Sequence, residues 1–286
     1  MESIRFPASD GTSLHALLFR AADSRACLAI AHGLQSHAEW YRETGEYLAA
    51  RGITVLAFDR RGSGHSDGVP GDTADAADFQ RDLDAAINRA RAESPDVHLL
   101  ANCFATRFVL PYANEHPESL RSILITSPAT DMKSQADYSF LERLWIPVAW
   151  AIDQIRGAQM RIRTPLKDRF FVSSGPWLEW IGRDSLGVRT VTPRFLLAAG
   201  KSTCAMYRSV DKIQLPLFVL LASHDAIVEN KGIRDRFRSY LGSLKMEEFP
   251  SEHMLEFGES AGSYRQAVID WIGGGYRTAS IPRSTL

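Results

Sequence analysis

A cysteine that could act as a nucleophile stands between a strand-like segment and a helix-like segment. Cys103 follows the apolar run 97–101 and precedes a helical pattern, with Ala101 and Ala105 two positions away on either side. Small residues at these two positions allow the sharp strand-to-helix turn of a nucleophile elbow. The start of a helix also favours a thiolate through its dipole and free N–H groups. The alternative is a buried structural cysteine that ends a strand.

Two further residues stand where partners of a nucleophile are expected. Asp225 follows the apolar run 217–222, and His253 follows the short run 246–249. The order nucleophile, acid, histidine, with each residue just after a strand, brings three loops to the same edge of a parallel sheet. Taken singly, Asp225 could cap a helix and His253 could be a loop histidine. Together with Cys103 they predict a catalytic triad.

An oxyanion hole is expected beside the elbow. The sequence His32-Gly33-Leu34 follows the apolar run 27–31. We expect the backbone N–H groups of Leu34 and Phe104 to point at a developing oxyanion, with Gly33 allowing a close approach of the chain.

The elements that must position these residues alternate along the chain. A hairpin over 4–7 and 14–19 is followed by apolar runs, separated by amphipathic helical patterns such as 41–51 and 76–93. Strands that are apolar throughout and alternate with helices predict a mostly parallel, eight-stranded α/β sheet with helices on both faces. The remaining apolar runs are 53–58 and 122–126, in addition to those named above.

The alternation is interrupted between about 128 and 214. This segment contains four of the six tryptophans and no convincing strand, so it predicts a helical insertion late in the sheet, of the kind that often covers a site at the strand ends. Most of its aromatic residues could simply be core. We therefore expect a core of residues 1–127 and 215–273, a helical cap of 128–214 and a flexible tail of 274–286.

Composition excludes several classes of protein. The chain has 286 residues, of which 45% are hydrophobic and 23% charged, with a formal net charge of −1, so disorder and phosphate-neutralising nucleic-acid binding are disfavoured. Three widely spaced cysteines predict neither a disulfide framework nor a zinc site. The glycine-rich stretch 62–68 lacks the third glycine of a dinucleotide fingerprint, so no cofactor and no metal are expected. The N-terminus lacks a signal-peptide pattern, no apolar run approaches a membrane span, and a cytoplasmic location is expected.

These residues resemble the α/β-hydrolase superfamily, and within it the monoacylglycerol-lipase-like group with a helical cap. The resemblance covers about residues 3–273. It depends on His32-Gly33, on the stretch from Asp59 to Gly68, on Cys103, Asp225 and His253, and on Asp184-Ser-Leu and Thr192-Pro-Arg-Phe at the end of the cap. The elbow departs from the family pattern, because cysteine replaces serine and alanines replace the two glycines.

A cysteine nucleophile favours particular chemistry. A thiolate paired with histidine attacks thioesters readily and forms an acyl enzyme that is itself a thioester, so acyl exchange between thiols is nearly isoenergetic. Cysteine variants of the superfamily include hydrolases, thioesterase-like enzymes, and shuttles that move aminoacyl groups between carrier-protein thiols in nonribosomal peptide pathways. The chain is most similar to this last kind.

Our first hypothesis is therefore an acyl- or aminoacyltransferase acting on carrier-bound thioesters. In it Cys103 is the nucleophile, His253 the general base and acid, and Asp225 the residue that orients the histidine. The alternatives are a hydrolase of small esters, thioesters or lactones, and an inactive ligand-binding protein.

The cap has a local basic excess that could attract an acidic carrier protein. A solvated helix face explains the same charges equally well. Within 151–200 four acidic residues stand against eight basic ones, which are Arg156, Arg161, Arg163, Lys167, Arg169, Arg183, Arg189 and Arg194.

Overall fold

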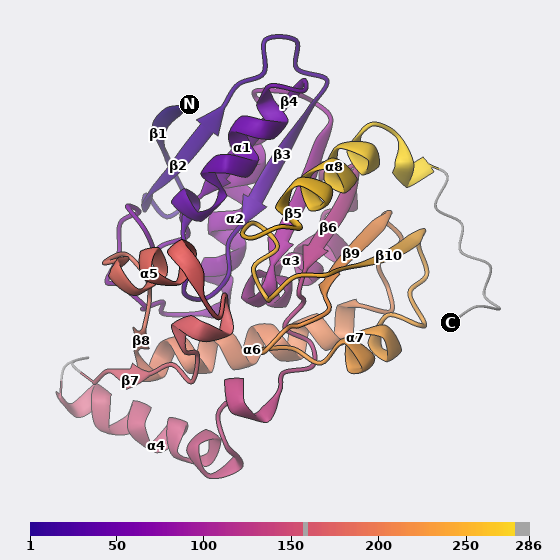
Figure 1. Ribbon diagram of the computed structural model, residues 1–286. Helices are drawn as coiled ribbons and strands as arrows, with labels where there is room; N and C mark the ends of the chain where they lie inside the picture. The colour runs from indigo at the N-terminus through magenta and orange to yellow at the C-terminus, as the bar shows by residue number, and fades with distance from the viewer. Residues whose placement is uncertain (157–159, 278–286) are drawn as a thin grey trace.

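A single eight-stranded sheet organises the molecule in a computed structural model that describes residues 1–156 and 160–277 (Figure 1). The strand order is β1-β2-β4-β3-β5-β6-β9-β10. Strands β1 and β2 are antiparallel to their neighbours, and the other pairs from β4 to β10 are parallel. The bounds are β1 (Glu2–Pro7), β2 (Ser13–Phe19), β3 (Ala26–Ala31), β4 (Ile53–Phe58), β5 (Val97–Asn102), β6 (Ser122–Thr126), β9 (Leu217–Ala222) and β10 (Leu244–Phe249). The predicted mostly parallel sheet is confirmed.

Helices cover both faces of this sheet. Every residue of the five strands β3, β4, β5, β6 and β9 is buried, which requires cover on both sides. Helices α1 (Arg42–Ala49) and α8 (Ala261–Ile272) pack together, while α2 (Ala76–Arg91) packs beside α3 (Thr106–Glu115). Helix α7 (Asn230–Arg236) joins β9 to β10. The parallel strands therefore all end at one edge, where the loops that hold the three predicted triad residues begin.

The segment between β6 and β9 is mainly helical. It contains α4 (Phe140–Arg156), α5 (Gly175–Arg183) and α6 (Pro193–Ser209), and α6 lies between α3 and the outermost helix α4 (Figure 1). It also contains a strand pair that the sequence did not predict, β7 (Ile162–Arg163) with β8 (Thr190–Val191), because two residues are too short to show an alternating pattern.

The C-terminal segment is described as far as residue 277. The expected flexible tail 274–286 begins with a 3₁₀ turn over Gly275–Arg277, in which the Tyr276 ring lies 6.3 Å from that of Trp271; residues 278–286 lie outside the described part. Within the described residues no helix combines the length and apolar character needed to cross a bilayer.

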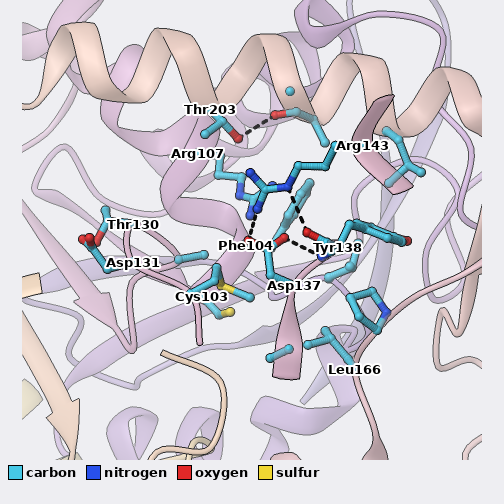
Figure 2. Close-up of a pocket in the computed structure, with 18 of the residues that line it drawn as sticks. Cys103, Phe104, Arg107, Thr130, Asp131, Asp137, Tyr138, Arg143, Leu166 and Thr203 are labelled. Carbon is cyan, nitrogen blue, oxygen red and sulfur yellow. Dashed lines mark hydrogen bonds and ion pairs between the residues drawn. The ribbon is translucent and has the colours of Figure 1, made fainter. Parts of the chain in front are cut away.

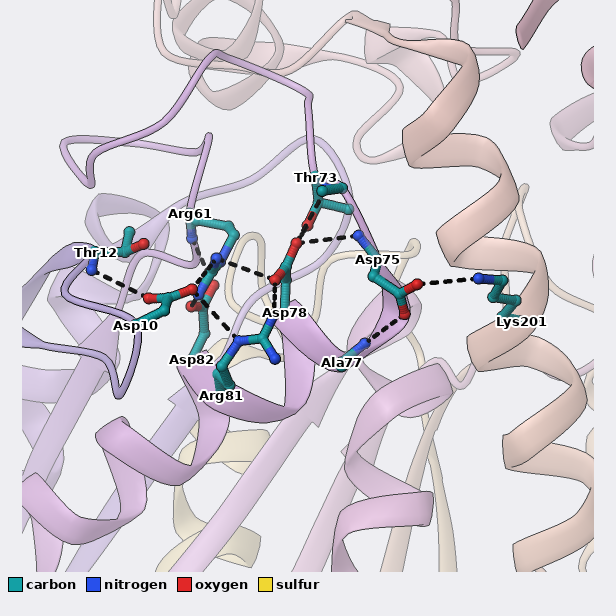
Figure 3. Close-up of polar contacts among 11 residues, drawn as sticks. Asp10, Thr12, Arg61, Thr73, Asp75, Ala77, Asp78, Arg81, Asp82 and Lys201 are labelled. Atoms are coloured by element: carbon teal, nitrogen blue, oxygen red, sulfur yellow. Dashed lines mark hydrogen bonds and ion pairs between the residues drawn. The ribbon is translucent and has the colours of Figure 1, made fainter. Parts of the chain in front are cut away.

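A polar network fixes the glycine-rich loop that follows β4 (Figure 3). The Arg61 guanidinium donates to Asp82 on α2 at 2.7 and 2.9 Å, and to Asp10 in the β1–β2 turn at 2.7 Å. Asp75 caps the start of α2 and forms an ion pair at 3.0 Å with Lys201 of α6. The loop is thereby attached to the β1–β2 turn, to α2 and to the helical segment.

Candidate active site

Cys103 occupies a strained turn between β5 and α3. The strand ends at Asn102, a 3₁₀ turn covers Cys103–Ala105, and α3 begins at Thr106. The backbone φ of Cys103 is 44°, in the left-handed region that residues other than glycine rarely adopt. Such strain persists only where the surrounding structure imposes it, and it gathers at functional sites. The side chain is 4% exposed, so the thiol faces a restricted space.

The histidine and the aspartate form a buried pair beside this turn. The Nδ1 atom of His253 lies 2.9 and 2.8 Å from the two carboxylate oxygens of Asp225. The same carboxylate accepts the backbone N–H groups of Ile227 at 2.7 Å and Val228 at 3.0 Å. Although burial favours the neutral acid, His253 and these N–H groups hold the pKa of Asp225 below its ordinary value. Asp225 is therefore ionised and fixes the orientation of the imidazole.

The other ring nitrogen of His253 faces Cys103. This Nε2 atom is buried and has no hydrogen-bond partner within the described residues. Burial opposes protonation of the ring, but the charge of Asp225 and then that of Cys103 outweigh it and raise the pKa of His253 to about 10. The structure thus brings together the three residues that the sequence proposed as a triad.

The two predicted oxyanion donors border the same space. Leu34 and Phe104 line the cavity onto which Cys103 opens, and no described residue accepts a hydrogen bond from either backbone N–H. Gly33 is needed here because a Cβ atom at this position would lie 2.7 Å from Oδ1 of Asn102. The loop after β3 can therefore approach the elbow closely, as an oxyanion hole requires.

Arg60 is a positioning residue that the sequence reasoning missed. Its guanidinium, 2% exposed, donates to the carbonyl of Gly33 at 2.7 Å and to that of Leu34 at 2.8 Å. Burial lowers the pKa of Arg60 to about 10. The side chain thus holds the loop that presents the Leu34 N–H, and the only sequence signal was its place in the stretch after β4.

A cavity of about 650 Å³ opens above Cys103 (Figure 2). This volume suits a small organic ligand. Apolar side chains from the turn at Cys103–Ala105, from α6 and from the segment between β6 and α5 supply much of its wall, including Met132, Leu166 and Phe195. Charged groups lie in the wall as well, among them Arg107 and Arg143.

The insertion also covers the catalytic histidine candidate. The Phe171 ring packs edge-on against His253 with 5.7 Å between ring centroids, and the Met254 N–H donates to the Phe171 carbonyl at 3.3 Å. His253 is fully buried as a result. Phe171 of the insertion therefore shields the His253 ring from solvent.

Neither of the other cysteines shares this setting. Cys27 lies in β3, where burial raises the pKa of its thiol to about 12, and Cys204 is exposed on α6. Within residues 1–156 and 160–277, no group of three His, Cys, Asp or Glu side chains could hold a metal ion.

The chain resembles known proteins over most of its length. The profile of the serine aminopeptidase S33 family (Hydrolase_4) matches residues 22–264. The uncharacterized protein YnbC of Escherichia coli K12 is 23% identical over 252 residues, which cover 84% of this chain and 41% of YnbC. The monoacylglycerol lipase of Mycolicibacterium smegmatis is 26% identical over 111 residues, covering 38% of this chain and 40% of that protein. The matched segments therefore span about two fifths of each of these relatives.

Solved structures share the fold. The monoacylglycerol lipase of Paleococcus ferrophilus superposes with a TM-score of 0.77 at 21% identity, covering 91% of this chain and 98% of that one. A carboxyl esterase from Bacillus coagulans gives a TM-score of 0.74 at 13% identity, covering 96% and 98%. At these identities the likeness concerns the fold.

Proposed function

The chain belongs to the serine aminopeptidase S33 family of α/β-hydrolases, and from this premise we infer that it cleaves small esters or thioesters through an acyl enzyme on Cys103. The family and the lipase-like and esterase-like neighbours favour a hydrolase over the transferase that the cysteine first suggested. The observation that carries the proposal is the left-handed φ of 44° at Cys103, beside a buried His253–Asp225 pair.

In the first half-reaction Cys103 becomes acylated. The Cys103 sulfur, paired as a thiolate with the protonated His253, attacks the carbonyl carbon, and the N–H groups of Leu34 and Phe104 donate to the resulting oxyanion. When the oxyanion collapses, the bond between the acyl carbon and the alkoxide or thiolate breaks, and His253 returns its proton to this leaving group. Asp225 stays ionised and stabilises the imidazolium throughout.

In the second half-reaction water releases the acid. A water molecule attacks the thioester carbon, its proton goes to His253, and the bond between sulfur and carbon breaks. The released Cys103 thiolate stays paired with the protonated His253, so the free enzyme is restored together with a carboxylic acid. The proposed cap, residues 128–214, sets the rate of this step through Phe171, which covers the histidine.

Acyl transfer to a thiol is the second candidate. It is favoured by the sulfur of Cys103, because a thiol acceptor exchanges one thioester for another of similar energy. A carrier protein docked on the basic cap is less well supported, since several of these side chains serve the fold. Arg161 donates to the carbonyls of Pro70 and Thr190, Arg189 donates to those of Ile181 and Asp184, and Arg194 pairs with Asp72.

Turnover in the presence of a thiol acceptor tests the proposal and separates the two reactions. The substrates are p-nitrophenyl butyrate and the butyryl thioester of N-acetylcysteamine, with cysteamine as the added acceptor. A hydrolase releases butyrate whether or not the acceptor is present, whereas a transferase yields butyryl-cysteamine.

Two variants serve as controls for this assay. Cys103→Ala should lose turnover to the background rate, and Cys204→Ser, at the exposed cysteine, should keep it. Turnover that survives in Cys103→Ala would refute the proposed nucleophile, and absence of turnover with every acyl donor would leave a ligand-binding protein.

A further inference from the structure

Arg107 is a cavity residue to which the proposed mechanism assigns no role. It lies on α3, four residues after Cys103 and thus one helical turn from the elbow, and it lines the cavity. Its guanidinium carbon lies 5.3 Å from the centroid of the Phe104 ring, next to one of the two oxyanion donors. The side chain therefore borders the space that an acyl group on Cys103 would occupy (Figure 2).

Among the described residues this guanidinium contacts the Phe104 ring but has no hydrogen-bond or ion-pair partner. Its Nε atom is buried without a hydrogen bond, and within the described residues no ion pair or hydrogen bond engages the side chain. Burial lowers the pKa of Arg107, and the groups that counter this effect are Cys103, Asp137 and Tyr207. An arginine with several donors and no acceptor in a partly enclosed space is costly unless a ligand satisfies it.

The second arginine of the cavity is a contrast. Arg143 forms an ion pair with Asp137 and donates from Nε to the Tyr138 carbonyl at 3.0 Å (Figure 2). Asp137 also accepts the Tyr138 backbone N–H at 2.8 Å. Asp137 is thus engaged by Arg143, and of the two other carboxylates that line the cavity, Asp131 and Glu229, Asp131 lies 3.8 Å from Arg236. None of the three forms an ion pair with Arg107 within the described residues.

We propose that Arg107 binds a carboxylate of the substrate, so that the acyl groups this site accepts are those of short dicarboxylic or other anionic acids. The guanidinium presents paired N–H donors that match the two oxygens of a carboxylate. An acyl chain that starts at Cys103 and ends in a carboxylate can reach Arg107 across one helical turn. The inference rests on the proposed acylation of Cys103.

Alkylation with a neutral and an anionic reagent tests the proposal without a known substrate. In a Cys204→Ser background, the rates at which iodoacetamide and iodoacetate modify Cys103 are measured by peptide mass spectrometry. A charge-assisted hydrogen bond corresponds to about ten- to hundred-fold in rate or affinity. Arg107→Met should therefore lower the ratio of the iodoacetate rate to the iodoacetamide rate at least about ten-fold. Arg183→Met, at an exposed arginine of α5 that does not line the cavity, is the control and should change it less than about three-fold.

Each outcome has a distinct meaning. An unchanged ratio in Arg107→Met would overturn the proposal, and so would an equal loss of both rates, because the arginine would then act on the thiol. Failure of Cys103 to react with iodoacetamide would instead refute the proposed function.

A second measurement needs no variant at position 107. Succinate should slow iodoacetamide modification of Cys103, and succinamide at the same concentration should not. Equal effects of the two would also overturn the proposal.

Discussion

Replacing Cys103 by glycine should give a more stable protein than replacing it by alanine. Both changes remove the thiol, so their difference isolates the backbone. At most positions glycine is the less stable residue by about 0.5–1 kcal/mol, because it loses more conformational freedom on folding. At a φ of 44° the order should reverse, since a Cβ atom in the left-handed region costs about 1–2 kcal/mol.

The magnitude follows from these two opposing effects. Glycine removes the backbone strain of the left-handed conformation, about 1–2 kcal/mol, but adds an entropic cost of about 0.5–1 kcal/mol. Cys103→Gly should therefore be more stable than Cys103→Ala by about 0.5–1 kcal/mol. Ala105 provides the matched control two residues away, because its φ of −61° is helical. There glycine should cost about 1 kcal/mol relative to the native alanine.

Urea unfolding followed by circular dichroism measures all four proteins, with the midpoint converted to a free energy through a common slope. In thermal unfolding a difference of 1 kcal/mol corresponds to about 2 °C for a chain of this size. If Cys103→Gly proves less stable than Cys103→Ala, as glycine should be at position 105, Cys103 does not occupy a strained elbow. The main geometric argument for a nucleophile would then fail.

Three other perturbations have definite expected outcomes. Asp225→Asn should lower kcat/KM by roughly 10²–10⁴-fold, because the imidazole loses its orienting anion. Asp225→Asn should also remove the stabilisation that the Asp225–His253 pair gives to the wild type. Wild type loses this stabilisation in acid, as pH falls through the lowered pKa of Asp225, and in alkali, as pH rises through the raised pKa of His253, about 10. The measurement is the free energy of unfolding against pH. Arg61→Met should cost about 3–5 kcal/mol in urea unfolding because it leaves buried carboxylates unpaired, whereas the exposed pair lost in Lys201→Met should cost less than about 1 kcal/mol. Arg60→Met should lower kcat about 10²-fold with a smaller effect on KM, since an oxyanion donor is misplaced; a larger change in KM would contradict this role.

The sheet and the convergence of the three candidate triad residues were predictable because the strands that precede them have a strong local signal. Strands such as Ile53–Phe58 are apolar throughout and short, which predicts a buried parallel sheet. Because strands alternate with helices along the chain, the strands run parallel, and the three residues that follow strand ends lie at the same edge of the sheet. The pairing of His253 with Asp225 then follows from topology and needs no knowledge of side-chain packing.

Other features depend on contacts between distant segments, which local patterns do not encode. The hydrogen bonds of buried Arg60 to the loop after β3 join residues 26 and 27 positions apart through backbone carbonyl groups, which every residue has. The two-residue pair of β7 and β8 is too short for a periodic signal. Arg107 resembles any helical arginine in the sequence, and its isolation appears only once Arg143 is seen to occupy the nearby carboxylate.

The identity of residue 103 does not by itself decide between a transferase and a hydrolase. In the proposed mechanism the sulfur of Cys103 makes the acyl enzyme a thioester, and the acceptor depends on which molecules reach the site. The family membership and the arginines that hold the cap together shift the balance toward water as the acceptor.

Intact-protein mass spectrometry after rapid acid quenching tests the central claim most directly. The protein is mixed with an excess of an acyl thioester, such as the succinyl or butyryl thioester of N-acetylcysteamine. We predict a mass increase of one acyl group, mapped by proteolysis to Cys103, absent in Cys103→Ala and retained in Cys204→Ser. Turnover without any adduct on Cys103, or an adduct on another residue that forms and decays at the rate of turnover, would contradict the account.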